Sequence, residues 1–210
     1  MLKWLRGMLV VVSSLWLSAC GLFGVSNVKE AKFDSVLVDN DFSVRQYAPA
    51  MLAQVSLVAN RYEDVSNTGF RSLFRYIDGN NRQQKKIAMT TPVVSQSAEK
   101  IAMTSPVVVT STGQQRYTMS FFLPRQYTAA NAPLPLDSKV KLVARPAMKM
   151  AVIRFSGSVT GARISLMTQR LRDWMKPRGY QAVGRPQVAL YNPPWTLPPL
   201  KRNEVLIPIR

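Results

Sequence analysis

The order of predicted secondary structure repeats once along the chain, and this internal repeat constrains the fold more than any other feature of the sequence. In the first half, residues 42–47 alternate between apolar and polar side chains and residues 51–58 are β-prone, as expected for a hairpin. Apolar residues recur every three or four positions over 62–77, which predicts an amphipathic helix. Strands are predicted to follow, the last of them at 116–123.

The second half has the same order. Residues 139–144 and 148–155 alternate as strands, and an apolar stripe at helical spacing covers 164–174. Strands at 187–191 and 204–209 complete this half, which gives the order ββαββ twice. Strands joined mainly by hairpins, with one helix in each half, predict an α+β domain whose mainly antiparallel sheet carries the two helices on its outer side.

A five-residue phrase, Lys-Ile-Ala-Met-Thr, occurs at both 86–90 and 100–104. Two copies at this short distance cannot form a stacked repeat array, so we expect a local β-hairpin with its loop at 95–99. Alternation along the two strands then places Met89 and Met103 on one apolar face. These methionines suit either the adaptable wall of a cavity or an ordinary core.

Each copy of the phrase is soon followed by a proline, Pro92 or Pro106. Proline has no N–H to donate to a β-ladder. We therefore expect each copy to end in a bulge or to lie along a sheet edge.

The N-terminus has the pattern of an export signal. Lys3 and Arg6 precede an apolar run that is too short to span a bilayer as a helix. The run ends in Leu-Ser-Ala-Cys at 17–20, which resembles a bacterial lipobox and predicts that Cys20 is lipidated. The expected division of the chain is a lipoprotein signal peptide at 1–19, a lipid-anchored tether at 20–31 and a folded domain at 32–210.

The residue after this cysteine is Gly21 rather than aspartate, which favours the outer membrane, facing the periplasm, over the inner membrane. The alternative is an ordinary secretory signal with an incidental cysteine. Because Cys20 is the only cysteine in the chain, no intrachain disulfide can form.

The composition excludes several classes of function. The chain has 28 Lys and Arg against 11 Asp and Glu, a net charge of +17, so its surface should attract anions. It contains no histidine, which removes the commonest general base and metal ligand. We therefore expect no enzymatic activity. A nucleic-acid partner is not expected either, because no aromatic-basic binding motif stands out.

Four motifs in order along the chain resemble those of the SOUL haem-binding protein family: Lys-Ile-Ala-Met-Thr-Thr-Pro-Val at 86–93, Phe-Phe-Leu-Pro at 121–124, Tyr-Asn-Pro-Pro-Trp at 191–195 and Arg-Asn-Glu-Val at 202–205. The resemblance implies a distorted β-barrel flanked by two helices with internal pseudo-twofold symmetry. It also implies non-catalytic binding of haem or a related tetrapyrrole in an apolar groove beside the first helix.

The first predicted helix offers the features that a porphyrin needs, an apolar surface and cations for its two propionates. Phe70, Leu73 and Phe74 lie on one stripe of this helix, together with Ile77, and Arg71 and Arg75 lie one turn apart on another. Further candidates for the propionates are Arg125, Lys201 and Arg202. With no histidine, the candidate iron ligands are tyrosines and methionines: Tyr47, Tyr62, Tyr76, Met89 and Met103.

Two other functions are compatible with the sequence. A basic, lipid-anchored domain could bind anionic lipid or a protein partner without any pocket ligand. A Cu(I) site made of thioethers could use Met119, Met148 and Met150. For Glu204, in the last motif, we expect a structural ion pair with Arg202 or another basic residue.

Overall fold

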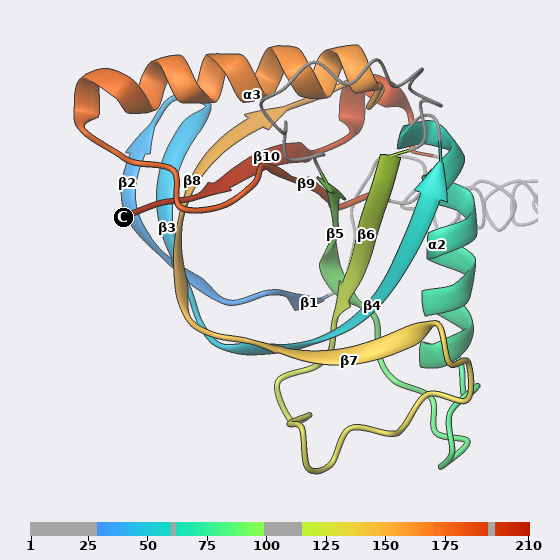
Figure 1. The fold of residues 1–210 in the computed structure, drawn as a ribbon. Coiled ribbons are helices and arrows are strands. Elements are labelled where there is room, and N and C mark those ends of the chain that lie inside the picture. Colours follow the sequence, from blue (N-terminus) through green and yellow to red (C-terminus); the bar gives the residue numbers. More distant parts are fainter. Residues whose placement is uncertain (1–28, 60–61, 99–114, 193–195) are drawn as a thin grey trace, which may run out of the picture.

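The computed structural model describes residues 29–59, 62–98, 115–192 and 196–210, which form one curled sheet with two α-helices on its outer side (Figure 1). The strands are β1 Lys29–Glu30, β2 Phe33–Asp39, β3 Phe42–Tyr47, β4 Ala50–Ala59, β5 Thr90–Ala98, β6 Gln115–Phe122, β7 Val140–Arg145, β8 Met148–Phe155, β9 Gln187–Leu190 and β10 Asn203–Pro208. The helices are α2 Tyr62–Ile77 and α3 Gly161–Met175, with short 3-10 helices at Lys176–Arg178 and Pro198–Leu200.

The strand order shows the internal symmetry that the sequence predicts. The order is β2-β3-β8-β10-β9-β5-β6-β4-β7, with β1 added in parallel beside β5. If β3, β4, β5 and β6 exchange places with β7, β8, β9 and β10, the order from β3 to β7 becomes its own reverse. The pseudo-twofold axis therefore passes between β5 and β9, the antiparallel pair at the centre of the sheet.

Alternation along the strands divides the side chains between an outer and an inner face. On the outer face, α2 covers a core that includes Val55, Met119 and Phe121. Helix α3 covers a second outer core, which includes Ile153 and Val205. The inner face carries a third cluster: Tyr47, Leu52, Val94, Phe122, Met150, Val152, Ala189, Tyr191 and Leu206.

Local sequence explains where the helices begin and end. Thr160 caps α3, because its hydroxyl accepts a hydrogen bond from the backbone N–H of Arg163 at 3.2 Å. Helix α2 ends at Ile77, and Gly79 then takes a φ of 114°, a conformation that suits glycine.

No helix within the described part of the chain combines the length and apolar character that crossing a membrane requires.

The predicted α+β fold class is confirmed, and the helix predicted at 62–77 has those bounds. The distorted barrel is an open half-barrel, because the outermost strands β2 and β7 each pair with one neighbour only among the described residues. Strand β2 was not predicted. Its central residues are exposed and its register with β3 shifts between Ser35 and Leu37, so it lacks the alternation of a half-buried strand.

The expected hairpin loop at 95–99 is wrong. Strand β5 runs on to Ala98, because Ser95 pairs with Met119 of β6 on one side and with Val188 of β9 on the other. The expected bulge near Pro92 is confirmed by a register shift between Thr90 and Val93. The second copy of the duplicated phrase, with Met103 and Pro106, lies outside the described residues.

The sheet begins inside the segment expected to be a tether. Lys29 and Glu30 pair in parallel with Thr90 and Thr91. The backbone N–H of Ala31 also donates to the carbonyl oxygen of Thr91 at 2.7 Å. The last residues before position 32 are therefore held by β5.

Candidate functional site

Two phenylalanines form an apolar platform on α2. The rings of Phe70 and Phe74 stack with their centroids 5.9 Å apart. Phe70 is half-buried and meets Phe121 of the sheet edge-on at 5.3 Å, whereas Phe74 is 44% exposed. The pair is thus anchored in the core at one end and open to solvent at the other.

The predicted apolar stripe divides between this platform and the core. Leu73 is fully buried and Ile77 is 5% exposed, and both belong to the cluster between α2 and the sheet. Leu73 therefore packs α2 against the sheet and does not line an open groove. The stripe is wide enough to reach from the buried side of the helix to its exposed flank, and only Phe74 and part of Phe70 lie on that flank.

Two arginines lie on the same helix as the platform. Arg71 and Arg75 are exposed and lie one turn apart on α2, as the helical spacing predicts. Neither forms an ion pair with another described residue, whereas Lys86, in the segment after the helix, pairs with Asp78 at 3.4 Å. The two arginines can therefore receive anionic groups of a ligand lying on the phenylalanines.

The segment after α2 folds back beside the helix and brings Met89 to the same side of the sheet. The backbone N–H of Ile87 donates to the carbonyl oxygen of Ile77 at 2.7 Å. Asn81 is fully buried and donates to the carbonyl oxygens of Tyr76 and Lys85 at 3.1 and 2.7 Å. Met89 is half-buried against the α2 core.

Two of the three tyrosines that could ligate iron have described side chains, and both are buried. Tyr76 is 1% exposed and its hydroxyl donates to the carbonyl oxygen of Pro133 at 2.9 Å. Burial raises the pKa of Tyr76 to about 12, which opposes formation of the phenolate that binds iron. Tyr47 is also 1% exposed, and burial raises its pKa as well. The side chain of Tyr62 lies outside the described residues.

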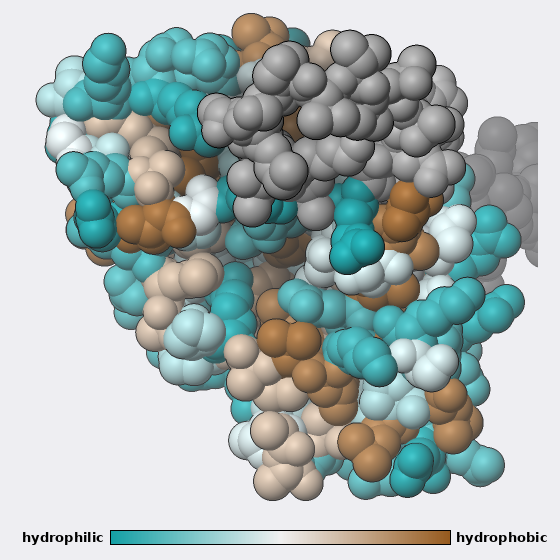
Figure 2. Space-filling view, viewed as in Figure 1, coloured by the Kyte–Doolittle hydropathy of each residue, from teal (hydrophilic) through white to brown (hydrophobic). Residues whose placement is uncertain are grey.

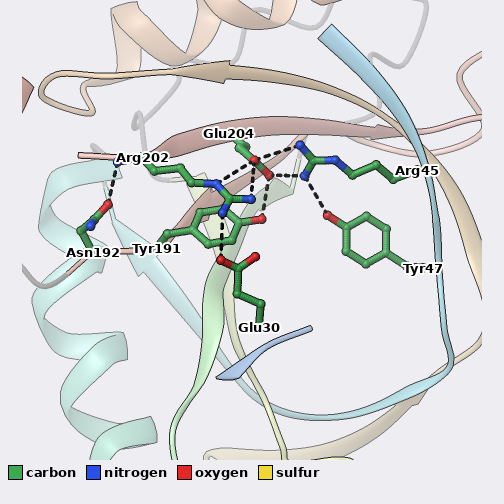
Figure 3. A network of polar contacts seen from close by, with 7 residues as sticks. All are labelled: Glu30, Arg45, Tyr47, Tyr191, Asn192, Arg202 and Glu204. Atoms are coloured by element: carbon green, nitrogen blue, oxygen red, sulfur yellow. Dashed lines mark hydrogen bonds and ion pairs between the residues drawn. The ribbon is translucent and has the colours of Figure 1, made fainter. Parts of the chain in front are cut away.

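A network of charged and phenolic groups occupies one half of the inner face (Figure 3). Glu204 is fully buried. Its carboxylate accepts hydrogen bonds from Arg45 at 2.8 and 3.1 Å, from Tyr191 at 2.7 Å and from Arg202 at 3.0 and 3.1 Å. Arg202 also pairs with Glu30 at 2.8 Å, which ties β1 to β10.

The electrostatics of this network favour its ionised form. Burial lowers the pKa of Arg45, but the Glu204 carboxylate more than offsets this effect, so the net pKa is raised. The same opposing causes raise the pKa of Arg202. Burial, reinforced by the nearby Glu204 carboxylate, raises the pKa of Tyr191 well above its ordinary value. Tyr191 therefore stays protonated and donates to Glu204.

The ion pair expected between Glu204 and Arg202 is confirmed. Because Arg202 is engaged by two carboxylates and lies 3.8 Å from the centre of the Tyr191 ring, it is a weak candidate for a propionate. Arg125 is exposed in the segment after β6, and Lys201 is half-buried just before β10. Only its position in an alternating strand distinguishes the partner Arg45 in the sequence.

The thioether site considered from the sequence is wrong. Met119 is buried in the outer core beneath α2, whereas Met148 and Met150 pack in the inner cluster. The sheet separates these sulfurs. Among the described residues no three His, Cys, Asp or Glu side chains come together as a metal site.

The other half of the inner face contains a cavity of about 250 Å³. Strands β4, β5, β6, β7 and β9 contribute to its wall, and so does Met148 at the start of β8. The wall includes Arg145, which the sequence placed in a turn between two strands and which in fact ends β7. No sequence signal distinguished this arginine from the many exposed ones.

Comparison with known proteins gives one consistent family. The model of the family described as SOUL heme-binding protein matches residues 28–208. Heme-binding protein 2 of Homo sapiens is 29% identical over 116 residues, which cover 55% of this chain and 52% of the human protein. Heme-binding protein 2 of Mus musculus is 27% identical over 138 residues, 66% of this chain and 63% of the mouse protein. This chain thus spans about half to two thirds of these two relatives.

A longer match extends over most of a third relative. Heme-binding protein 1 of Xenopus laevis is 23% identical over 164 residues, 78% of this chain and 81% of the frog protein. Among solved structures, the EcmrR C-terminal domain has a TM-score of 0.60 at 9% identity, covering 80% of this chain and 96% of that domain. A hydrolase from Listeria innocua has a TM-score of 0.57 at 8% identity, covering 83% and 94%. These structural likenesses show the fold alone.

Proposed function

The chain belongs to the SOUL heme-binding protein family, and on that premise we propose that it binds haem or a related tetrapyrrole on the exposed face of α2, without catalysing a reaction. The relatives named heme-binding proteins 1 and 2 support the ligand class. The observation that carries the location is the stacked pair of Phe70 and Phe74, one of them 44% exposed, with Arg71 and Arg75 on the same helix.

The chemistry of this face fits the ligand. A flat macrocycle can lie against aromatic rings, and offset stacking adds to the apolar area removed from water. Its propionates need cations at the edge of the apolar platform, where Arg71 and Arg75 offer bidentate donors. Met89 beside the helix adds a polarisable side chain.

Iron ligation contributes little to this proposal. Tyr47 and Tyr76 are buried and hydrogen-bonded, and the chain has no histidine. We expect binding to rest on the porphyrin face and the propionates. A protoporphyrin without iron should therefore bind with an affinity within about tenfold of that of haemin, a difference of about 1.4 kcal/mol.

The proposal is tested by titrating the purified chain with haemin while following the Soret band and tryptophan fluorescence. Saturation at one equivalent, with a Soret shift that an equally basic unrelated protein does not give, supports it. Non-saturating quenching equal to that of the control protein would refute it. That result would favour the second candidate, in which the basic surface of this chain of net charge +17 binds anionic lipid or a partner protein.

We also propose that the chain is a lipoprotein of the bacterial cell envelope, anchored through Cys20 and facing the periplasm from the outer membrane. The lipobox-like Leu-Ser-Ala-Cys at 17–20 and the following Gly21 support this. Metabolic labelling with palmitate should mark the native chain and leave a Cys20→Ser variant unlabelled. Equal labelling of both, or processing of the variant at the same site, would contradict the anchor.

A further inference from the structure

The cavity on the inner face lies where the pseudo-twofold symmetry places the counterpart of the Glu204 network. Pairing registers relate the two halves position by position: Leu52 opposes Phe122 as Met150 opposes Pro208. Continuing along these strands, Thr118 takes the place of Glu204. One half therefore fills its inner face with an ion network, and the other half has a short hydroxyl side chain there and leaves a cavity.

Neutral polar side chains line this cavity in a continuous row. Gln187 of β9 pairs with Gln96 of β5, which pairs with Thr118 of β6. In the next row Ser120 pairs with Gln54 of β4. Directly opposed residues on one face of a sheet lie within contact distance, so amide and hydroxyl groups from four strands face one volume of about 250 Å³.

Among the described residues that line the cavity, one is a cation, Arg145. The guanidinium carbon of Arg145 lies 4.6 Å from the centre of the Phe122 ring and 5.2 Å from that of Tyr47. Its Nε is buried and has no hydrogen-bond partner in the described structure. Burial lowers the pKa of Arg145, an effect that the nearby Tyr47 only partly offsets. Arg145 is half-buried, its Nε is removed from water, and it has no carboxylate partner among the described residues, so an acceptor at its guanidinium would be stabilising.

The surrounding charges indicate what kind of acceptor fits. The neighbouring network contains two guanidinium groups, Arg45 and Arg202, and two carboxylates, Glu204 and Glu30. It is therefore close to neutral as a whole, and Arg145 leaves one positive charge unbalanced. A single guanidinium suits a monoanionic carboxylate, which it can bind with two parallel hydrogen bonds.

We propose that the inner-face cavity of this protein binds a small organic carboxylate, with Arg145 receiving the carboxylate and the Gln96–Gln187 pair receiving a polar group at the far end of the ligand. The apolar part of such a ligand would pack against Leu52 and Val94, which also line the cavity. Figure 2 shows mixed hydrophilic and hydrophobic surface around the recess between the two halves of the sheet.

This site is separate from the tetrapyrrole site proposed above. The platform of Phe70 and Phe74 lies on the outer face of the sheet, whereas Arg145 and the glutamines lie on the inner face. The cavity is also smaller than the roughly 300–1,000 Å³ of pockets that enclose drug-sized ligands. It suits a ligand of one ring or a short chain.

The test is a titration of the ¹⁵N-labelled full chain with 4-hydroxybenzoate, and separately with its neutral isostere 4-hydroxybenzamide. Arginine Nε–H signals are observed directly by NMR. The benzoate should shift the Arg145 Nε–H signal and saturate, because a carboxylate bound to the guanidinium changes the electronic environment of its Nε–H. The benzamide should bind at least tenfold more weakly.

Two variants and a matched control locate the effect. Arg145→Gln should weaken benzoate binding at least tenfold, and Gln96→Leu several-fold, whereas Arg172→Gln, at an exposed position of α3, should leave it unchanged. Haemin affinity should be the same in Arg145→Gln as in the native chain. If Arg145→Gln does not fold, the native titrations and Gln96→Leu decide.

The proposal is overturned by any of three results: no saturating shift of the Arg145 Nε–H signal, equal affinities for benzoate and benzamide, or unchanged benzoate affinity in a folded Arg145→Gln variant. Selective, saturating binding supports it if Arg145→Gln weakens that binding, or, where Arg145→Gln does not fold, if Gln96→Leu weakens it.

Discussion

Replacing Glu204 by glutamine tests how much the buried ion network of the inner face contributes to the free energy of unfolding. Glu204 is fully buried and accepts five hydrogen bonds of 2.7 to 3.1 Å from Arg45, Tyr191 and Arg202. Glutamine keeps the size of the side chain but removes its charge and turns one oxygen into a donor. Two guanidinium groups then lie close together, and Arg45 is left without a counter-ion among its hydrogen-bond partners.

The magnitude follows from this geometry. Removing one partner of a buried ion pair costs about 3–5 kcal/mol, because the remaining charge is left uncompensated. A domain of ordinary stability has only about 5–15 kcal/mol in total. Glu204→Gln should therefore lower the free energy of unfolding by about 3–5 kcal/mol, a large part of the whole.

The matched control is Asp78→Asn. Asp78 pairs with Lys86 at 3.4 Å, but the two side chains are 54% and 83% exposed, so solvent screens the pair and its loss should cost less than about 1 kcal/mol. Both variants are measured by urea unfolding followed by tryptophan fluorescence, with the slope m checked for two-state behaviour. A loss below about 1 kcal/mol in Glu204→Gln, equal to the control, would refute the account of the network.

Four further predictions follow from the α2 side of the molecule. Leu73→Ala should cost about 2–5 kcal/mol in urea unfolding because it empties a fully buried site; a cost under 1 kcal/mol would place Leu73 outside the core. Phe74→Glu should weaken haemin binding at least tenfold while leaving the urea midpoint nearly unchanged, since this ring is 44% exposed; unfolding with unaltered affinity would contradict it. The Arg71→Ala/Arg75→Ala pair should make the residual haemin affinity less dependent on salt, and an unchanged salt dependence would remove both from the propionate role. The pKa of Tyr76 is raised from 10.0 to about 12, so the folded state keeps this proton longer than the unfolded state does, and the associated stability is complete below about pH 10 and lost between about pH 10 and 12; Tyr76→Phe should therefore flatten the fall in unfolding free energy over that window, and an identical slope in the variant would be the contrary result.

Much of the fold could be predicted because burial on one face leaves a periodic trace. Strands β3 and β8 alternate in sequence, the β4 region is β-prone, and the apolar stripe of α2 predicted the bounds of that helix. The ββαββ order then implied the pseudo-twofold symmetry. Strand β2 has no such trace, because its side chains are mostly exposed.

The loop expected at 95–99 shows a different limit. The duplicated phrase suggested that the two copies pair with each other. A strand in the middle of a sheet, however, can pair with strands that are distant in the sequence. Around Ser95 those neighbours are β6 and β9, which begin some twenty and ninety residues further on. Local similarity carries no information about such long-range pairing.

The candidate site was predicted in part. The helical spacing of Phe70, Phe74, Arg71 and Arg75 placed them on α2, and the structure adds that the two rings stack. The sequence pattern could not show that Leu73 belongs to the core, because a wide apolar stripe on a helix does not indicate which of its residues are buried. The roles of Arg45 and Arg145 depend on strands that are far apart in the sequence. The sequence alone does not show which of the 28 basic residues are buried.

Mapping a bound tetrapyrrole by NMR tests whether α2 is the binding face. One equivalent of a diamagnetic zinc protoporphyrin is added to the ¹⁵N-labelled chain, and backbone amide shifts are recorded. The largest shifts should fall on Phe70 to Arg75 and around Met89. Shifts centred on the inner face near Arg145, or small shifts spread over the whole basic surface, would contradict it.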